Sequence, residues 1–417
     1  MTVVSDLTVP DVTVPDVTVP DVTVPDLASP LTPPGVDPVR ESMRRLPRAL
    51  QYPLTLLTGR PLAGQAPLRW WTPAFHLFSA LFSMAAGVVV SVTGWTLGGS
   101  WLLLLLPGWA MTLHGMRNLR MMIYHQCSHR NMFRRKKLDA AIGRAVSSLL
   151  IVQHFSRYSE EHVADHHAAH HMTLRDPTVQ AFLISLDLHP GMTRRQMWRR
   201  MLGKLFSPVF HTTFAVARVR SFWHEGSRAE RITAGALYGG SLLAGVLTGT
   251  WAALLVVWFV PLVPLFQVSN TLRLCVKHTF PDPSLTERRG KAYFGSLTNA
   301  IFIGEALPAA GGRLRWGARM LFVHLPSRYL VLTGDTVVHD FHHRLPAARN
   351  WADYLFARQA DAERGGGGGW PPYHHVWGLV AAINLVFDSL SVADPVEFDV
   401  RRIRDVSRRE LFAAFDD

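Results

Sequence analysis

Residues 70–116, WWTPAFHLFSALFSMAAGVVVSVTGWTLGGSWLLLLLPGWAMTLHGM, contain no Lys, Arg, Asp or Glu. Residues 232–272, ITAGALYGGSLLAGVLTGTWAALLVVWFVPLVPLFQVSNTL, also lack these charged residues. One membrane crossing needs about 20 apolar residues, so each stretch is long enough for two crossings joined by a tight turn. A soluble domain rarely excludes charge from such long runs, because its surface needs polar residues. We therefore expect an all-α integral membrane protein with four transmembrane helices in two hairpins.

Glycine-rich turns divide both charge-free stretches. The first stretch divides at residues 94–100 and the second near residues 245–250. The expected transmembrane spans therefore lie near residues 73–94, 100–120, 231–248 and 251–271. Pro261 and Pro264 should kink the last span, which is tolerated where neighbouring helices cover the carbonyls that proline leaves without a donor.

The net charge of +12 comes largely from arginines and lysines that flank the charge-free stretches. If each stretch is a hairpin, these flanking residues all fall on one side of the membrane. The positive-inside rule makes that side the cytoplasm and places both termini there. Anionic lipid headgroups are sufficient partners for this charge, and no nucleic-acid motif is present, so we expect a membrane and no nucleic acid as the partner.

The remaining chain divides by composition. Residues 1–36 repeat Thr-Val-Pro-Asp with a five-residue period, and proline at this density predicts a disordered, extended tail. Residues 37–69 form a basic, partly amphipathic lead-in, and residues 70–417 form a single membrane domain with a Gly-rich hinge at 365–369. The apolar run at 376–390 contains Asp388 and is short, which favours a cytoplasmic or interfacial helix over a fifth span.

Three segments carry histidines at helical spacing. The first is His125-Gln-Cys-Ser-His129, and the last is His339-Asp-Phe-His342-His343. Positions i, i+3 and i+4 share one helix face, so the imidazoles of each segment can point at one metal. The middle segment, HVADHHAAHH at 162–171, allows two groupings. These are His162, His166 and His167, or His167, His170 and His171.

A single HxxxH pair can arise on a helix by chance. Three such segments next to the expected spans predict that the segments bind metal together. Eight histidines exceed one tetrahedral centre and indicate two metals. Imidazole suits Fe, Cu, Ni and Zn alike, so ligand type alone does not select iron. A carboxylate often accepts a hydrogen bond from the other ring nitrogen of such a histidine and so orients the ring. The candidates nearby in sequence are Asp165, Asp340, Glu161 and Asp335.

Two histidines lie inside the charge-free stretches, His76 and His114. His114 precedes His125 by about three helical turns and so shares roughly its face. It either lines a substrate channel or packs against a neighbouring hydroxyl. A histidine-rich metal transporter or sensor is the rival class of protein. Transporters place their ligands near the membrane midplane, however, whereas these clusters lie outside the spans.

The order and spacing of the histidine segments, with Phe133 after the first and Asp176-Pro177 after the second, resemble the membrane fatty acid desaturase and alkane hydroxylase superfamily. The resemblance covers roughly residues 70–350. It implies a four-helix membrane bundle with a helical cytoplasmic cap, a diiron site, O2 as co-substrate, and an external electron donor of ferredoxin, rubredoxin or cytochrome type. It also favours the first grouping of the middle segment, with His170 and His171 as alternates.

The family supplies a further histidine after the fourth span, and His278 matches it. The metal ligands and catalytic residues that the resemblance implies are His125, His129, His162, His166, His167, His278, His339, His342 and His343, holding two iron ions. In the acyl-CoA desaturase branch an Asn commonly lies four residues before this histidine. Here that residue is Leu274, which departs from that branch.

The expected reaction is O2-dependent desaturation, which introduces a C=C bond into the apolar chain of a lipid. Hydroxylation or ketone formation on a lipid, alkane or isoprenoid could use the same site, and the histidine spacing does not separate these reactions. No electron-carrier segment is visible in the sequence, so we expect electrons to come from a separate protein.

Overall fold

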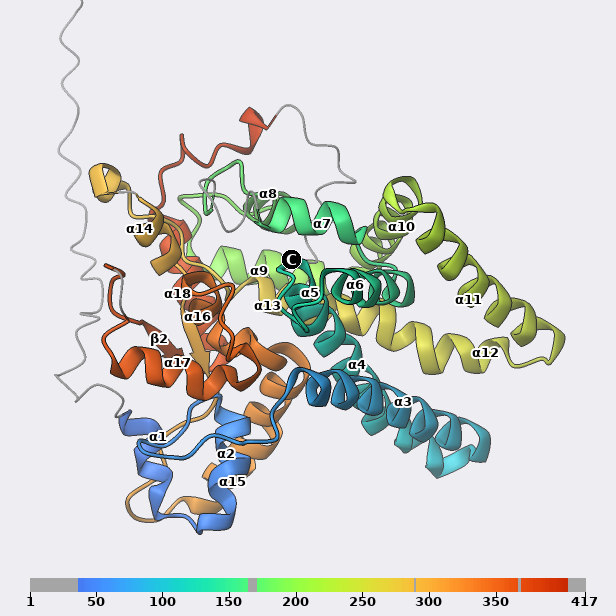
Figure 1. The fold of residues 1–417 in the computed structure, drawn as a ribbon, viewed down its shortest axis with the longest axis horizontal. Helices are drawn as coiled ribbons and strands as arrows, with labels where there is room; N and C mark the ends of the chain where they lie inside the picture. The colour runs from blue at the N-terminus through green and yellow to red at the C-terminus, as the bar shows by residue number, and fades with distance from the viewer. Residues whose placement is uncertain (1–36, 164–170, 289, 367–368, 404–417) are drawn as a thin grey trace, which may run out of the picture. The chain divides into compact units, whose positions relative to one another are not determined.

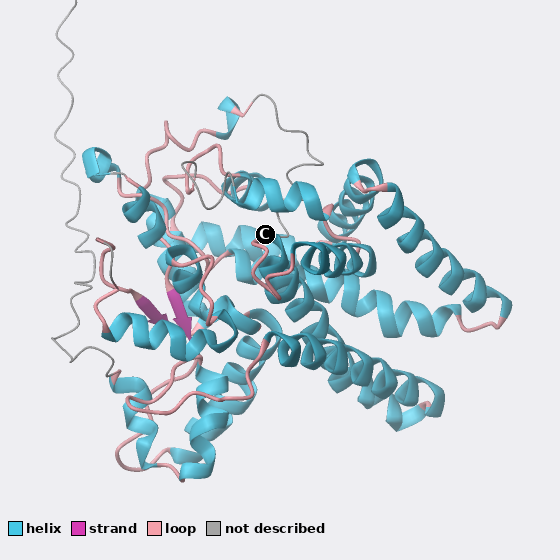
Figure 2. Cartoon of the chain, in the orientation of Figure 1, coloured by secondary structure: helices cyan, strands magenta, loops and turns pink. Residues whose placement is uncertain are grey.

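The computed structural model describes residues 37–163, 171–288, 290–366 and 369–403. Within these residues the chain is mostly helical, and its only strands are two short ones (Figures 1 and 2). The repeat tail expected at 1–36 and part of the glycine run at 365–369 lie outside the described residues.

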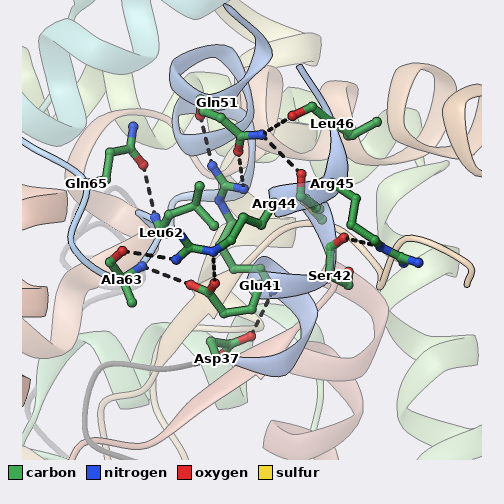
Figure 3. Close-up of polar contacts among 12 residues, drawn as sticks. Asp37, Glu41, Ser42, Arg44, Arg45, Leu46, Gln51, Leu62, Ala63 and Gln65 are labelled. Atoms are coloured by element: carbon green, nitrogen blue, oxygen red, sulfur yellow. Dashed lines mark hydrogen bonds and ion pairs between the residues drawn. The ribbon is translucent and has the colours of Figure 1, made fainter. Parts of the chain in front are cut away.

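The lead-in folds around the buried guanidinium of Arg40. Asp37 caps the first helix by accepting hydrogen bonds from the backbone N–H groups of Val39 and Arg40. Arg40 donates to the carbonyl oxygens of Arg60 and Gln51. The Gln51 amide donates in turn to the carbonyl of Leu46 (Figure 3). The lead-in helices are α1 (Pro38–Ser42), η1 (Met43–Arg45), η2 (Arg48–Leu50) and α2 (Gln51–Thr58).

The lead-in packs against a later part of the chain. Arg45 Nη2 donates to the carbonyl of Leu307 at 2.7 Å, and Leu307 N donates to Ser42 Oγ at 2.7 Å. Met43, Leu54, Leu307 and Met320 form a small apolar core of their own. We call residues 38–58 together with 305–331 the platform. Its later helices are α15 (Arg313–Arg319), η9 (Met320–His324) and η10 (Ser327–Val331).

The first helix pair begins at Thr72, which caps α3 (Pro73–Leu97). The chain then turns and returns alongside α3 (Figure 1). The returning helical run consists of η3 (Gly99–Leu104), α4 (Leu105–Asn118), η4 (Leu119–Tyr124) and α5 (His125–Ser128). A Cβ on Gly87 would lie 2.4 Å from the backbone nitrogen of Thr112, so only glycine permits this approach. Such small-residue contacts are typical of helices packed within a membrane.

The second helix pair starts at a capping box, in which Ser227 and Glu230 satisfy each other's backbone N–H groups. The chain winds as π-helix on both sides of Val260, around Pro261 and Pro264, where proline removes backbone donors. The pair consists of α11 (Arg228–Leu247), α12 (Trp251–Leu254), η6 (Leu255–Phe259), η7 (Pro261–Leu265) and α13 (Phe266–Leu274).

Two helical runs are long and apolar enough to cross a membrane, Pro73–Leu97 and Trp251–Leu274. The other two expected spans are helical but do not meet the same criterion among the described residues. The one near 100–120 lies in a helical run whose α-helical part, α4, has 14 residues. The one near 231–248 lies in α11, whose first turn carries Arg228, Glu230 and Arg231.

Five helices lie between the two pairs among the described residues, and the first two of them pack against α5. They are α6 (Lys136–Leu150), α7 (Phe155–Glu161), α8 (Pro177–Leu186), α9 (Arg194–Leu205) and α10 (Pro208–Glu225). Phe155 and Tyr158 of α7 pack on Tyr124, with ring centroids 5.4 and 4.8 Å away. This aromatic contact holds α7 against the helix that leads into α5.

The last part of the chain pairs two strands and adds further helices. Strand β1 (Ala300–Phe302) runs parallel to β2 (His375–Trp377), with Ile301 opposite Val376. The helices are η8 (Pro283–Arg288), α14 (Lys291–Ser296), η11 (Gly334–Val338), α16 (His339–Arg344), η12 (Trp351–Asp353), α17 (Tyr354–Glu363), α18 (Leu379–Val392) and η13 (Val400–Arg402). With 14 residues, α18 is too short for a crossing, and it packs on α9 through the Trp198–Asn384 hydrogen bond.

Candidate metal centre

The first histidine segment lies where the returning helical run of the first pair ends. His125 begins α5, and the helix terminates at His129, after which Arg130 has a φ of 55° that turns the chain away. Ser128 Oγ donates to the His125 carbonyl, and Ser159 of α7 donates to the Ser128 carbonyl at 2.7 Å. The first bond lies within α5, and the second holds α5 against α7, whose C-terminal cap is His162.

Four histidines from three segments converge in a first group: His125, His129, His162 and His342. One ring nitrogen from each lies within 4.8 Å of the others. Nε2 of His125 lies 2.8 Å from Nε2 of His162, and Nε2 of His342 lies 3.0 Å from Nε2 of His129. Two imidazoles bound to one metal at about 2.1 Å have nitrogens roughly 3 Å apart, so these separations fit a shared ion.

A second group consists of His171, His278 and His343, again with ring nitrogens within 4.8 Å of one another. Their ring centroids are 4.6 to 4.9 Å apart. All three side chains are buried. The ligand atoms come from the middle segment, from the loop after α13, and from α16.

His339 lies between the two groups. Its Nε2 atom is 3.2 Å from Nε2 of His343 in the second group. Its ring centroid is 6.0 Å from that of His125 and 5.8 Å from that of His342, both in the first group. Helix α16 therefore contributes one histidine to each group and a third at their junction, as the i, i+3, i+4 spacing allows.

Part of the middle segment lies outside the described residues, including His166, His167 and His170. His162 belongs to the grouping of the middle segment that the sequence favoured, and the structure places it in the first group. It places His171, named from sequence only as an alternate, in the second group. His171 also lies near the carboxylate of Asp176, with 3.5 Å between Nδ1 and Oδ2.

The environment favours neutral imidazoles. Burial lowers the pKa of His125 and of His339 well below the usual histidine value, and the nearby charge of Lys277 lowers both further. A metal binds the neutral form of histidine, so this environment keeps the ligands in their binding state without competition from protons.

Three of the four carboxylates expected behind the histidines, Glu161, Asp335 and Asp340, lie among the described residues, and Asp165 lies outside them. His278 Nδ1 lies 2.9 Å from the hydroxyl of Thr298, a partner 20 residues downstream that the sequence did not indicate. Asp340 instead forms a buried, bidentate ion pair with Arg358, at 2.7 to 2.9 Å. Glu161 pairs with Arg157 at 2.5 Å.

Asp335 is the expected carboxylate that borders the histidines. It lines the same small cavity as His125, His162 and His339, together with the buried Lys277. Burial raises the pKa of Asp335 to about 6, although Gln126 donates a hydrogen bond to its carboxylate. Lys277 was seen in the sequence only as a flanking basic residue, and its position in this cavity required the fold.

The donor set suits two metal ions. Seven imidazoles form two compact groups with His339 at the junction, and no cysteine thiol lies in either group. An all-histidine set of this size suits a transition metal such as iron, copper or zinc and does not suit calcium or magnesium, which take oxygen ligands.

Comparison with known proteins covers the middle of the chain. The family model described as fatty acid desaturase matches residues 99–305. The matched part contains the first two histidine segments, His278 and Thr298, and it ends before the third segment. No curated protein matched the chain. With three histidine segments brought together beside apolar helices, the chain belongs to the membrane fatty acid desaturase and hydroxylase superfamily.

Proposed function

We propose that the protein is a diiron oxidoreductase that introduces a double bond into the acyl chain of a lipid, with O2 as the oxidant. The convergence of His125, His129, His162 and His342, and of His171, His278 and His343, carries this proposal. Family membership supports an oxidoreductase with a lipid substrate in a membrane.

We propose that the metal ligands come from the nine histidines inferred from the sequence, and that His171 is a further ligand in the second group. The nine are His125, His129, His162, His166, His167, His278, His339, His342 and His343. Iron bound by these residues would supply the oxygen activation needed to break an unactivated C–H bond. The protein positions the chain and excludes water. In the overall reaction, O2, two electrons and two protons remove two hydrogens from adjacent carbons and give two molecules of water.

The electrons come, in this proposal, from a separate carrier of ferredoxin, rubredoxin or cytochrome type. The overall reaction needs two electrons beyond those of the substrate. The chain has two cysteines, Cys127 and Cys275, both buried, so it lacks the cysteine ligands of an iron–sulfur centre of its own.

We also propose that both helix pairs cross the membrane as hairpins, giving four spans with the histidines and both termini in the cytoplasm. The two long apolar helices support one span in each pair. The basic residues on both sides of each pair support this orientation. Reporter fusions at each terminus and at the turn near Gly249 test it, because a signal from the side opposite the cytoplasm at a terminus contradicts the proposed orientation.

Product analysis tests the reaction. The protein is expressed in a host of known lipid composition, and the lipids are analysed by mass spectrometry. Loss of two hydrogens per product chain supports desaturation. Gain of one oxygen identifies hydroxylation and replaces the proposed reaction with its nearest alternative. As a control, His224→Ala should leave the products unchanged, because His224 is exposed and its Nδ1 bonds to the Arg220 carbonyl of its own helix.

A further inference from the structure

A cavity of about 390 Å³ lies between the platform and the first helix pair. Its lining is largely apolar and aromatic, with Leu56 on the platform side and Trp71 and Phe75 at the start of α3. This volume falls within the usual range for small-molecule sites.

The inner end of the cavity reaches the wall of the histidine site. Met122 and Gly334 line the cavity, and their neighbours in sequence, Met121 and Asp335, line the small space that borders His125. Gly334 has a φ of 56°, and a Cβ there would lie 3.0 Å from Asn118 Oδ1 and 3.1 Å from the sulfur of Met122. Only glycine fits this position without displacing these atoms, so the backbone of residue 334 can pack directly on Asn118 and Met122.

The outer end opens among exposed apolar side chains. Leu56 and Leu325 line the cavity and are 37% and 38% exposed, and Trp70 beside them is 53% exposed. A cavity for a water-soluble ligand would open on polar surface, so this opening suits an apolar chain that arrives from a lipid phase.

Contacts with α3 place the platform at the depth of a candidate span. The hydroxyl of Tyr329 lies 3.4 Å from Ser83 Oγ, and its ring stacks on His114 with 3.7 Å between centroids. Ser83 lies ten residues into α3, about 15 Å along the helix from its start. The helical run that ends at Val331 therefore reaches well past the beginning of the apolar helix.

The surface of this run has the composition of a helix at a lipid interface. Leu314, Leu321 and Phe322 are 92%, 52% and 75% exposed. Arg313 and Arg315 are exposed on the same run, and Arg319 pairs with Glu305. Large exposed apolar side chains next to arginines suit the boundary between acyl chains and anionic headgroups.

We propose that this cavity is a lateral entrance through which the acyl chain of an intact membrane glycerolipid reaches the histidine site. The start of the helical run, with Arg313 and Arg315, lies in the headgroup layer and contacts lipid phosphates, and its end at Val331 reaches deeper beside α3. The acyl chain passes Leu56 and Phe75 towards Met122 and Gly334. This inference rests on the proposed function and adds the carrier of the substrate, a membrane lipid in place of a water-soluble thioester.

Photocrosslinking tests the entrance independently of catalysis. Membranes containing the protein are loaded with phosphatidylcholine that carries a diazirine on one acyl chain, irradiated, and digested for peptide mapping. We expect adducts on the peptides that contain Leu56, Phe75 and Tyr329. Ser79 is exposed and lines the cavity. Ser79→Trp should lower those adducts about fivefold or more, because the indole fills the opening.

Two further variants control this experiment. Phe82→Trp adds bulk on the outward face of α3, where Phe82 is 73% exposed, and should leave the cavity adducts unchanged. Leu325→Trp narrows the outer end from the platform side and replaces Ser79→Trp if that variant does not fold. Equal labelling in wild type, Ser79→Trp and Leu325→Trp would overturn the proposal.

The same measurement separates this proposal from the proposed function. Crosslinking does not need turnover, so it can also be measured in His342→Ala. If cavity adducts form but the wild type produces no oxidised lipid, the entrance is supported and the proposed reaction is contradicted. Conversely, a wild-type enzyme that oxidises an acyl thioester in detergent, shows no cavity adducts and leaves glycerolipids unchanged contradicts the entrance and supports the reaction.

Discussion

The hydroxyl of Thr298 lies 2.9 Å from Nδ1 of His278, although the two residues are 20 positions apart. The isolated backbone bridge between the same residues holds this geometry. A hydrogen bond at Nδ1 leaves Nε2 available for a metal ion and orients the ring towards His171 and His343.

The first prediction follows from this contact. Thr298→Val keeps the shape of the side chain but removes the oxygen, so metal affinity at the second group should fall about 10- to 100-fold. Thr298→Ser keeps the oxygen and should retain most of the affinity. Iron retained after dialysis against a graded chelator measures the effect. Equal retention in both variants would show that Thr298 does not orient His278.

The second prediction concerns the two histidine groups. His342→Ala should reduce the iron bound to the first group, and His171→Ala should reduce the iron bound to the second. In each variant, iron measured by mass spectrometry should fall from about two per chain to about one or less, because each group has lost a ligand. His224→Ala is the control. Full iron content in His171→Ala would remove His171 from the ligand set.

The third prediction concerns the buried ion pair behind α16. Arg358→Met leaves the carboxylate of Asp340 buried without its partner, which should destabilise the fold by about 3–5 kcal/mol. Thermal unfolding in detergent measures this loss. Arg401→Met breaks an exposed pair with Asp399 and should change little. The double variant Asp340→Asn with Arg358→Met should recover part of the stability, since no buried charge remains.

The fourth prediction concerns the acid stability of the contact between Asp37 and His375. Burial alone would raise the pKa of Asp37, but the hydrogen bond and charge of His375, with backbone and Trp377 contacts, lower it below the usual value. The stability from Asp37 is therefore fully present above the unfolded pKa, near 3.9, and is lost as pH falls through the lower folded pKa.

Asp37→Asn should thus have a lower Tm than the wild type at neutral pH. At strongly acidic pH the two Tm values should become similar. Thermal scans from neutral pH down to about pH 3, on either side of the ordinary aspartate pKa, measure the effect. His375→Gln should weaken the same dependence, because it removes the imidazole whose Nε2 lies 2.9 Å from the Asp37 carboxylate. A constant difference in Tm between Asp37→Asn and wild type across this range would contradict the assignment.

Much of the helical framework was predictable because its signals are local. The absence of charge in residues 70–116 predicted the first helix pair, and the structure has α3 and the returning run there. The irregular helix around Pro261 and Pro264 was also predictable, since each proline removes its own backbone N–H donor. The number of spans was not settled in this way, because α11 joins an apolar stretch to a charged first turn.

The site was predictable in its residue types but less so in its partners. Helical spacing predicted that His339, His342 and His343 share a face, and all three lie at the centre. Spacing could not assign His171 to a group, because the segment from 162 to 171 allows several pairings. Thr298 and Arg358 gave no local signal, since their contacts with His278 and Asp340 depend on how distant segments fold together.

The returning helical run continues without a break from Leu105 through Ser128 and carries His125 at its end. If this run crosses the membrane as proposed, a rod of this kind, about 36 Å long, sets the height of the histidine groups relative to the bilayer. If the substrate is held by its headgroup, the enzyme acts as a ruler. The double bond should then appear at a constant count of carbons from the glycerol end, whatever the total chain length.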